Sequence, residues 1–183
     1  MLNKIKQKII DDYFDYKQTL KKVSDEMYSE ENIKFYNLDQ GIFKRINKIE
    51  GKISRELTSA DCIDFQNNYI YLIEFKNGKI EKKEERFQIR LKLFESLIGI
   101  LKIVKELNYD INDIIKLNKK FILVYNEEKN VVNPNRWIEG KANIEILQKQ
   151  LQEYAGVIYD EVYVLSREEF KTIYLEKYYG TKN

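Results

Sequence analysis

The sequence predicts an α/β domain in which helices cover both faces of a mixed sheet, and three observations indicate this class. Apolar residues recur at three- and four-residue spacings near the start of the chain, which is typical of an amphipathic helix. Two runs rich in β-branched and aromatic residues, 61–66 and 69–76, predict a β-hairpin. The continuous apolar run at 121–125 is typical of a buried central strand, and helical segments follow the later strands.

The N-terminal half is expected to hold a helix, a weak strand and the hairpin. We expect one helix over residues 2–28, because the apolar residues of this segment share a face. A weaker apolar signal at 42–46 is a candidate strand. Asn67 and Asn68 are expected to form the hairpin turn, since asparagine tolerates a positive φ.

The C-terminal half is expected to alternate helices and strands. Ser166 and Glu169 have the spacing of a capping box, which predicts that a helix begins at residue 167. The expected elements are a long helix at 80–107, the buried strand at 121–125, a helix at 142–154, a strand at 157–165 and a last helix at 167–178.

Composition excludes several classes of protein. We expect a single domain over residues 1–183, because the chain is long enough to bury a core and 13% of it is aromatic. The formal net charge is only +2, so any surface that binds nucleic acid must be a local one. The chain has no histidine, which excludes Ser-His-Asp hydrolases, Cys-His proteases and His-ligated zinc sites. Its chemistry must therefore use carboxylates, lysine, tyrosine or hydroxyl groups.

The sequence also predicts a cytoplasmic protein that is not embedded in a membrane. Cys62 is the only cysteine, so no internal disulfide can form, which fits a reducing compartment. The first ten residues lack the apolar core of a secretory signal. The most apolar segment, 91–104, is too short to span a bilayer and is interrupted by Lys92, Glu95 and Lys102.

The register of the hairpin brings two carboxylates together. With Asn67 and Asn68 in the turn, Asp61 lies directly opposite Glu74, and directly opposed side chains share a face. Lys76 lies two residues beyond Glu74 and shares that face, whereas Asp64 points to the other one. Because opposed like charges are destabilising, a compensating cation is expected, and hard divalent metals prefer carboxylate oxygens.

Asp61 followed by Glu74-Phe75-Lys76 resembles the signature of the PD-(D/E)XK nuclease superfamily, which has the restriction-endonuclease-like fold. The resemblance implies an αβββαβ core with a mixed central sheet, here followed by a further helix, strand and helix. Ala60 stands where the family name has proline. The family's additional acidic residue from the first helix has no assigned position here, and its candidates are Glu26, Glu30 and Glu31.

The resemblance also implies a catalytic role for each motif residue. Asp61, Glu74 and the backbone carbonyl of Phe75 would hold Mg²⁺ or Mn²⁺. The metal would activate a water molecule and stabilise charge on the scissile phosphate. Lys76 would orient that water or stabilise the developing negative charge. The alternative interpretation of the same residues is a surface ion pair between Glu74 and Lys76 or another neighbour.

A basic stripe follows the hairpin. Its residues recur at spacings of four, three and four, which places them on one face of a helix where they could follow a nucleic-acid backbone. Interspersed glutamates leave a second interpretation open, that of a solvated helix face. The members of the stripe are Lys79, Lys83, Arg86 and Arg90.

We therefore expect a metal-dependent nuclease that hydrolyses phosphodiester bonds in DNA, with RNA as the other candidate substrate. Two alternatives stay open. The same fold could bind a protein or nucleic acid without catalysis. An unrelated α/β interaction protein could instead use its tyrosine-rich surfaces to form a homodimer, since the chain has fourteen tyrosines.

Overall fold

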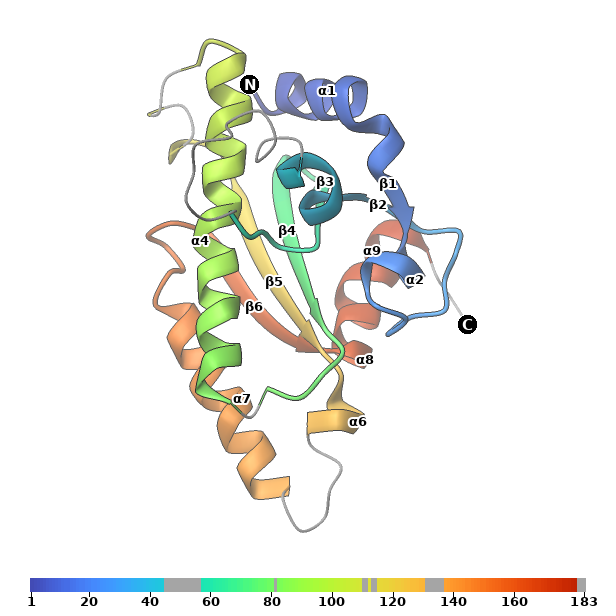
Figure 1. Cartoon of the computed structure of the whole chain (residues 1–183), viewed down its shortest axis with the longest axis vertical. Helices are drawn as coiled ribbons and strands as arrows, with labels where there is room; N and C mark the ends of the chain where they lie inside the picture. Colours follow the sequence, from blue (N-terminus) through green and yellow to red (C-terminus); the bar gives the residue numbers. More distant parts are fainter. Residues whose placement is uncertain (45–56, 81, 110–111, 113–114, 131–136, 181–183) are drawn as a thin grey trace.

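The computed structural model describes residues 1–44, 57–80, 82–109, 112, 115–130 and 137–180. Within these residues the strands form one mixed sheet, in which β1 to β4 run antiparallel to one another and β4 to β6 run parallel (Figure 1). The strands lie in the sheet in chain order: β1 (Lys17–Thr19), β2 (Lys34–Asn37), β3 (Cys62–Gln66), β4 (Tyr69–Lys76), β5 (Lys119–Tyr125) and β6 (Glu161–Ser166).

Helices pack on both faces of the sheet, as the sequence predicts. Among the described residues, no helix is long and apolar enough to cross a membrane. The helical elements are α1 (Leu2–Tyr13), the 3₁₀ turn η1 (Phe14–Tyr16), α2 (Leu20–Val23), the π-helical turn η2 (Leu38–Phe43), α4 (Lys83–Glu106), α6 (Glu127–Asn130), α7 (Trp137–Gln152), α8 (Arg167–Phe170), the π-helical turn η3 (Lys171–Leu175) and α9 (Glu176–Tyr179).

The core is divided between the two faces of the sheet, because successive side chains of a strand point in opposite directions. On one face, Leu72 and Phe121 pack with residues of α4 and α7 such as Ile100 and Leu147. On the other face, Ile73 and Ile122 pack with α2 and with the helical segment formed by α8, η3 and α9. Any side chain of the hairpin is therefore assigned to the α4 face or to the α8 face by its position alone.

The hairpin has the predicted register. Gln66 pairs with Tyr69, Asp64 with Tyr71 and Cys62 with Ile73. Asn67 and Asn68 form the turn with φ of 47° and 63°. Both residues are thus in the left-handed region that a tight two-residue hairpin turn requires.

The single N-terminal helix is the largest error of the sequence prediction. Helix α1 ends at Tyr13, and the chain continues through the edge strand β1 before the short helix α2. Ile5 and Ile9 are buried on the α4 face, whereas Leu20 and Val23 are buried on the opposite face. One straight helix could not reach both faces, so the chain has to bend around the edge of the sheet.

Other differences are smaller. Ile42 and Phe43 belong to the helical turn η2 rather than to a strand, and residues 45–56, which include the rest of that expected strand, lie outside the described part. Strand β2 was not predicted. Helix α4 starts three residues later than expected and α7 starts five residues earlier, while the capping box of Ser166 and Glu169 is present at α8.

Candidate carboxylate site

Two carboxylates meet at the end of the hairpin on the α4 face. Glu74 lies in β4, and Asp61 immediately precedes β3, so the predicted juxtaposition follows from the observed register. Asp61 Oδ2 accepts a hydrogen bond of 2.7 Å from the backbone N–H of Phe75. This bond replaces the next step of the β3–β4 ladder and fixes the Asp61 carboxylate beside β4.

The cation between these carboxylates is Lys92 of α4. Its Nζ lies 2.8 and 3.0 Å from the two oxygens of Glu74 and 3.4 Å from Oδ1 of Asp61. The Glu74 side chain is 4% exposed, whereas those of Asp61 and Lys92 are 23% and 25% exposed. The sequence indicated that a compensating cation was needed but did not identify Lys92. Spacing within a helix does not show which of its faces meets the sheet.

The same face of α4 holds the segment that leads into Asp61. The buried Glu95 accepts hydrogen bonds from the backbone N–H and the hydroxyl of Thr58, at 2.6 and 2.8 Å. Ser96 Oγ accepts one from the backbone N–H of Ala60 at 2.8 Å and donates one to the carbonyl of Lys92 at 2.6 Å. Helix α4 therefore positions Asp61 as well as supplying its counter-charge.

Burial raises the pKa values of both carboxylates, and nearby negative charge adds to this effect. Burial is the main cause that raises the pKa of Glu74 to about 8, and the charge of Asp61 adds to it. Burial also raises the pKa of Asp61, against the opposing effect of Lys92. Burial would lower the pKa of Lys92, but the charges of Glu74 and Asp61 outweigh it and raise that pKa. The site thus favours a bound proton or an additional cation.

A third acidic residue, Asp39, lies near the pair. Its charge contributes to the raised pKa values of both Asp61 and Lys92. Asp39 belongs to η2, where the backbone N–H of Leu38 donates to the carbonyl of Asp61 at 3.0 Å. Phe43 of the same turn packs against Gly99 of α4, where the Cβ of any other residue would collide with its ring. The weak pattern around this turn gave no sequence signal for Asp39.

The sequence candidates for the additional acid lie elsewhere. Glu31 is 3.2 Å from Lys21 in an exposed ion pair. Glu26 has a φ of 59° in the turn that follows α2, and Glu30 accepts a backbone hydrogen bond from Lys21 at its carbonyl. Asp39, rather than any of these three glutamates, is the acidic residue whose charge raises the pKa of Asp61.

Lys76 has a different neighbour from the one expected. It forms an ion pair with Glu85 in the first turn of α4. Its charge still lowers the pKa of Glu74, although it is the last of the contributing effects. Lys76 thus lies at the border of the site, while Lys92 contacts the carboxylates directly.

The basic stripe does not point at the carboxylates. Lys79 precedes α4, so only Lys83, Arg86 and Arg90 belong to that helix. At about 100° per residue, Arg86 and Arg90 lie roughly 120° and 160° around the helix from Lys92. Arg86 donates a hydrogen bond of 3.2 Å to Asn143 of α7. The periodicity correctly placed Lys83, Arg86 and Arg90 on one face, but the prediction was wrong for Lys79, and that face is turned away from the site.

The donor set fits a divalent metal in part. Within the described residues, no group of three His, Cys, Asp or Glu side chains is close enough together to hold a metal ion. Asp61 and Glu74 supply two hard oxygen ligands. The carbonyl of Phe75 points toward the β3 side, as does its N–H, because Lys76 directs its own carbonyl to β5. A bound ion would need this carbonyl and water to complete its coordination.

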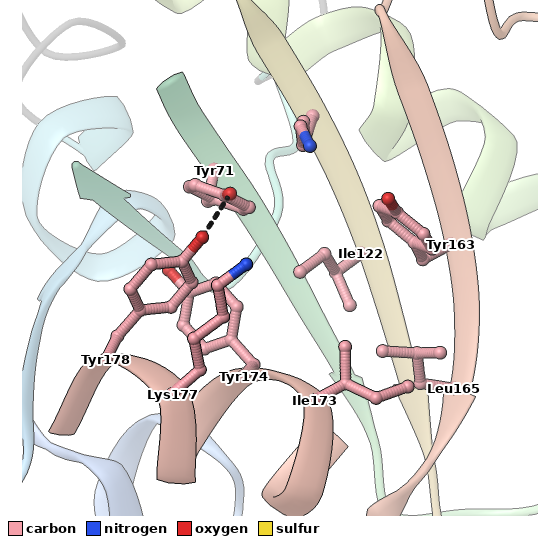
Figure 2. Close-up of a pocket in the computed structure, with 9 residues that line it drawn as sticks. Tyr71, Ile122, Tyr163, Leu165, Ile173, Tyr174, Lys177 and Tyr178 are labelled. Atoms are coloured by element: carbon pink, nitrogen blue, oxygen red, sulfur yellow. Dashed lines mark hydrogen bonds between the residues drawn. The ribbon is translucent and has the colours of Figure 1, made fainter. Parts of the chain in front are cut away.

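A separate cleft lies on the opposite face of the sheet, between β6 and the C-terminal helical segment (Figure 2). Its volume is about 60 Å³. Tyr71 and Tyr178 share a hydrogen bond of 3.0 Å at its rim, and Lys120 lies 4.2 Å from the centre of the Tyr69 ring. Lys120 also forms a 2.9 Å ion pair with Glu161. The ammonium group of Lys120 is thus already held by aromatic rings and by Glu161, and Tyr71 of β4 packs against Tyr178 of the C-terminal helical segment.

Comparisons with known proteins give no relative. The chain matches no protein-family model, no curated protein and no solved structure. The geometry of the carboxylate site is therefore the basis for a functional proposal.

Proposed function

We propose that this protein is a metal-dependent nuclease of the PD-(D/E)XK type that hydrolyses phosphodiester bonds in DNA. The observation that carries the proposal is the meeting of Asp61 and Glu74 at the end of a hairpin, with Lys92 across both. The element order, α1, then antiparallel β2 to β4, then α4 and a parallel β5, is consistent with an αβββαβ core. RNA is the second substrate to test, because nothing in the site reads a base or a 2′-hydroxyl.

The residues that would hold Mg²⁺ or Mn²⁺ are Asp61, Glu74 and the Phe75 carbonyl. When bound, such an ion lowers the pKa of a coordinated water and stabilises charge on a phosphate. The raised pKa of Glu74 supports this assignment, since it indicates a carboxylate whose negative charge is not fully balanced by Lys92. Asp39 would add negative potential without being a direct ligand.

The protein's own groups would orient the reacting phosphate. The Phe75 N–H holds one oxygen of Asp61, which leaves Oδ1 directed at Lys92. Lys92 is partly exposed and carries the ammonium group closest to the carboxylates, so it would donate to a phosphate oxygen as negative charge develops. Lys76 would take a secondary role, because Glu85 competes for it.

Contacts to the nucleic-acid backbone remain part of the proposal. Lys79 and Lys83 lie near the beginning of α4, close in sequence to Lys76, and Lys83 is exposed. Arg86 already bonds to Asn143 of α7, so Arg86 and Arg90 would contact phosphates only away from the carboxylates. The two pairs of basic residues would therefore contribute differently to binding.

A second candidate function is a binding module of the same fold without catalysis. The observation that favours it is the ion-pair network itself, in which Lys92 already contacts both carboxylates without a metal. A site of this kind can be purely structural.

A cleavage assay distinguishes the two functions. Wild-type protein is incubated with circular, linear and branched DNA and with RNA, in Mg²⁺, in Mn²⁺ and in EDTA. A nuclease cleaves at least one substrate only with metal, and Glu84→Gln, which alters an exposed carboxylate of α4, serves as the active control. Absence of cleavage, together with an unchanged melting temperature in Mn²⁺, would favour the binding module.

A further inference from the structure

An apolar seam runs along the outer side of α4. Its residues recur at alternating spacings of four and three, and its exposed members are large. Phe87 is 51% exposed, and Phe94 and Ile98 are each 38% exposed. The α4 seam consists of Phe87, Leu91, Phe94, Ile98 and Leu101.

Only the inner edge of the α4 seam touches the core, where Leu101 packs against it, and the seam is separate from the carboxylate site. At about 100° per residue, Phe87, Phe94 and Ile98 lie roughly 120–160° around the helix from Lys92. Tyr154, which follows α7, packs edge-on against Phe94 with 4.8 Å between the ring centres. This contact marks the border of the seam toward α7.

The spacing and the charge of the α4 seam indicate what it binds. Alternation of four and three residues is the a/d pattern with which one helix packs along another. Basic residues border the seam, since Lys83 and Lys105 are exposed near its two ends and the guanidinium of Arg90 lies 5.9 Å from the Phe87 ring centre. Glu84 and Glu106, which are exposed near the two ends of the helix, offset part of this positive charge, and Glu106 also pairs with Lys8.

We propose that the α4 seam docks an amphipathic helix of a partner protein whose apolar stripe is flanked by acidic residues. A second copy of this chain is a poorer occupant, because pairing two α4 helices would bring their basic borders together. A membrane surface is also a poorer occupant, because the seam is a narrow a/d stripe, whereas a helix that lies in a membrane interface presents a broad apolar face. The seam spans about two heptads, so a short helix covers it and the complex is expected to be transient.

A synthetic peptide tests this proposal directly. The probe is a labelled 21-residue helix with leucine at a and d and glutamate at e and g, and its control carries lysine at e and g. Fluorescence anisotropy with the full chain should give an affinity for the acidic peptide at least about tenfold higher than for the basic one, and salt should weaken it. Equal affinities for the two peptides would overturn the proposal.

Matched variants locate the surface. Phe87→Ser and Ile98→Ser should each weaken binding of the acidic peptide by at least about fivefold. Ile146→Ser, which alters a side chain of α7 that is 45% exposed, should leave it unchanged. Circular dichroism melts verify that all three variants fold. If one of the two seam variants does not fold, the other still tests the proposal. An equal loss in Ile146→Ser would contradict the assignment to α4.

Two further outcomes would replace the proposed partner with another occupant. Light scattering that shows a wild-type dimer, lost in Ile98→Ser, would assign the α4 seam to self-association. Co-sedimentation with phosphatidylserine vesicles without peptide binding would assign it to a membrane surface. Because these measurements need neither metal nor cleavage, their results are independent of the proposed nuclease activity.

Discussion

The two faces of the hairpin carry buried carboxylates in contrasting surroundings. Asp64, on the α8 face, accepts hydrogen bonds from the hydroxyls of Tyr174 and Tyr179 at 2.8 and 2.7 Å. Burial raises the pKa values of both tyrosines, so their hydroxyls remain donors. Glu74, on the α4 face, is instead balanced by the partly exposed ammonium of Lys92.

This difference separates a structural carboxylate from a candidate reactive one. Fixed neutral donors satisfy Asp64 and join the C-terminal helical segment to the sheet. At Asp61 and Glu74 the charge is shared among ionisable groups close to solvent, and the pKa of Glu74 is raised to about 8. Such a site can exchange its proton for a metal ion. Asp64 is already satisfied by neutral donors and is not expected to bind one.

The largest expected effect is on catalysis. Asp61→Asn and Glu74→Gln nearly conserve shape but remove a metal ligand each, so either should reduce cleavage by at least about a hundredfold. Asp64→Asn should keep the activity per folded molecule, because this residue lies on the opposite face. Initial cleavage rates, normalised to the folded fraction, measure both effects. If cleavage required Asp64 but not Glu74, the roles assigned to the two faces of the hairpin would be contradicted.

Removal of Lys92 should have the next largest effect. Lys92→Met leaves two partly or fully buried carboxylates without their counter-charge and should destabilise the metal-free protein by about 1–3 kcal/mol. Lys105→Met, an exposed change in the last turn of the same helix, should cost less than about 0.5 kcal/mol. Urea denaturation provides the comparison. Mn²⁺ should recover part of the Lys92→Met loss, and similar losses in both variants would contradict the role assigned to Lys92.

On the other face, Tyr179→Phe removes one donor from Asp64. A loss of about 1–2 kcal/mol in the free energy of unfolding is expected, since the acceptor is a buried carboxylate. Tyr178→Phe is the matched control, because its hydroxyl bonds to the neutral hydroxyl of Tyr71 rather than to Asp64, and should cost less. Metal affinity should be unchanged in both variants. A changed Mn²⁺ affinity in Tyr179→Phe would show that the two faces are coupled.

The remaining prediction is a pH dependence of stability that comes from Glu74. The pKa of Glu74 is near 4.5 when unfolded and about 8 when folded, so the folded state holds its proton more tightly. The stability this provides is complete below pH 4.5 and is lost as the pH rises through about 8. In EDTA, wild-type stability should therefore fall relative to Glu74→Gln between about pH 5 and 8. Parallel pH profiles of the two proteins would indicate that Glu74 has an ordinary pKa.

The sequence predicts those features of the fold and the site that a local residue pattern determines, and it misses those that depend on tertiary packing. A two-residue Asn-Asn turn fixes the hairpin register, and a period of two then assigns Asp61, Glu74 and Asp64 to their faces. The contacts of Lys92 and Ser96 depend on the rotation of α4 about its axis, which residue spacing alone does not set. In the N-terminal segment, residues 20–23 continue a helical spacing although the chain has already turned to the other face of the sheet, so tertiary packing overrides their local pattern.

Titration of the apo protein with Mn²⁺ tests the central claim most directly. Isothermal titration calorimetry at about pH 7.5 is carried out on wild type, Glu74→Gln and Asp64→Asn. We expect saturable binding to wild type and Asp64→Asn, with release of protons as the carboxylates take up the metal, and at least about tenfold weaker binding to Glu74→Gln. No binding to wild type, or equal binding to Glu74→Gln, would contradict the claim that Asp61 and Glu74 form a metal site.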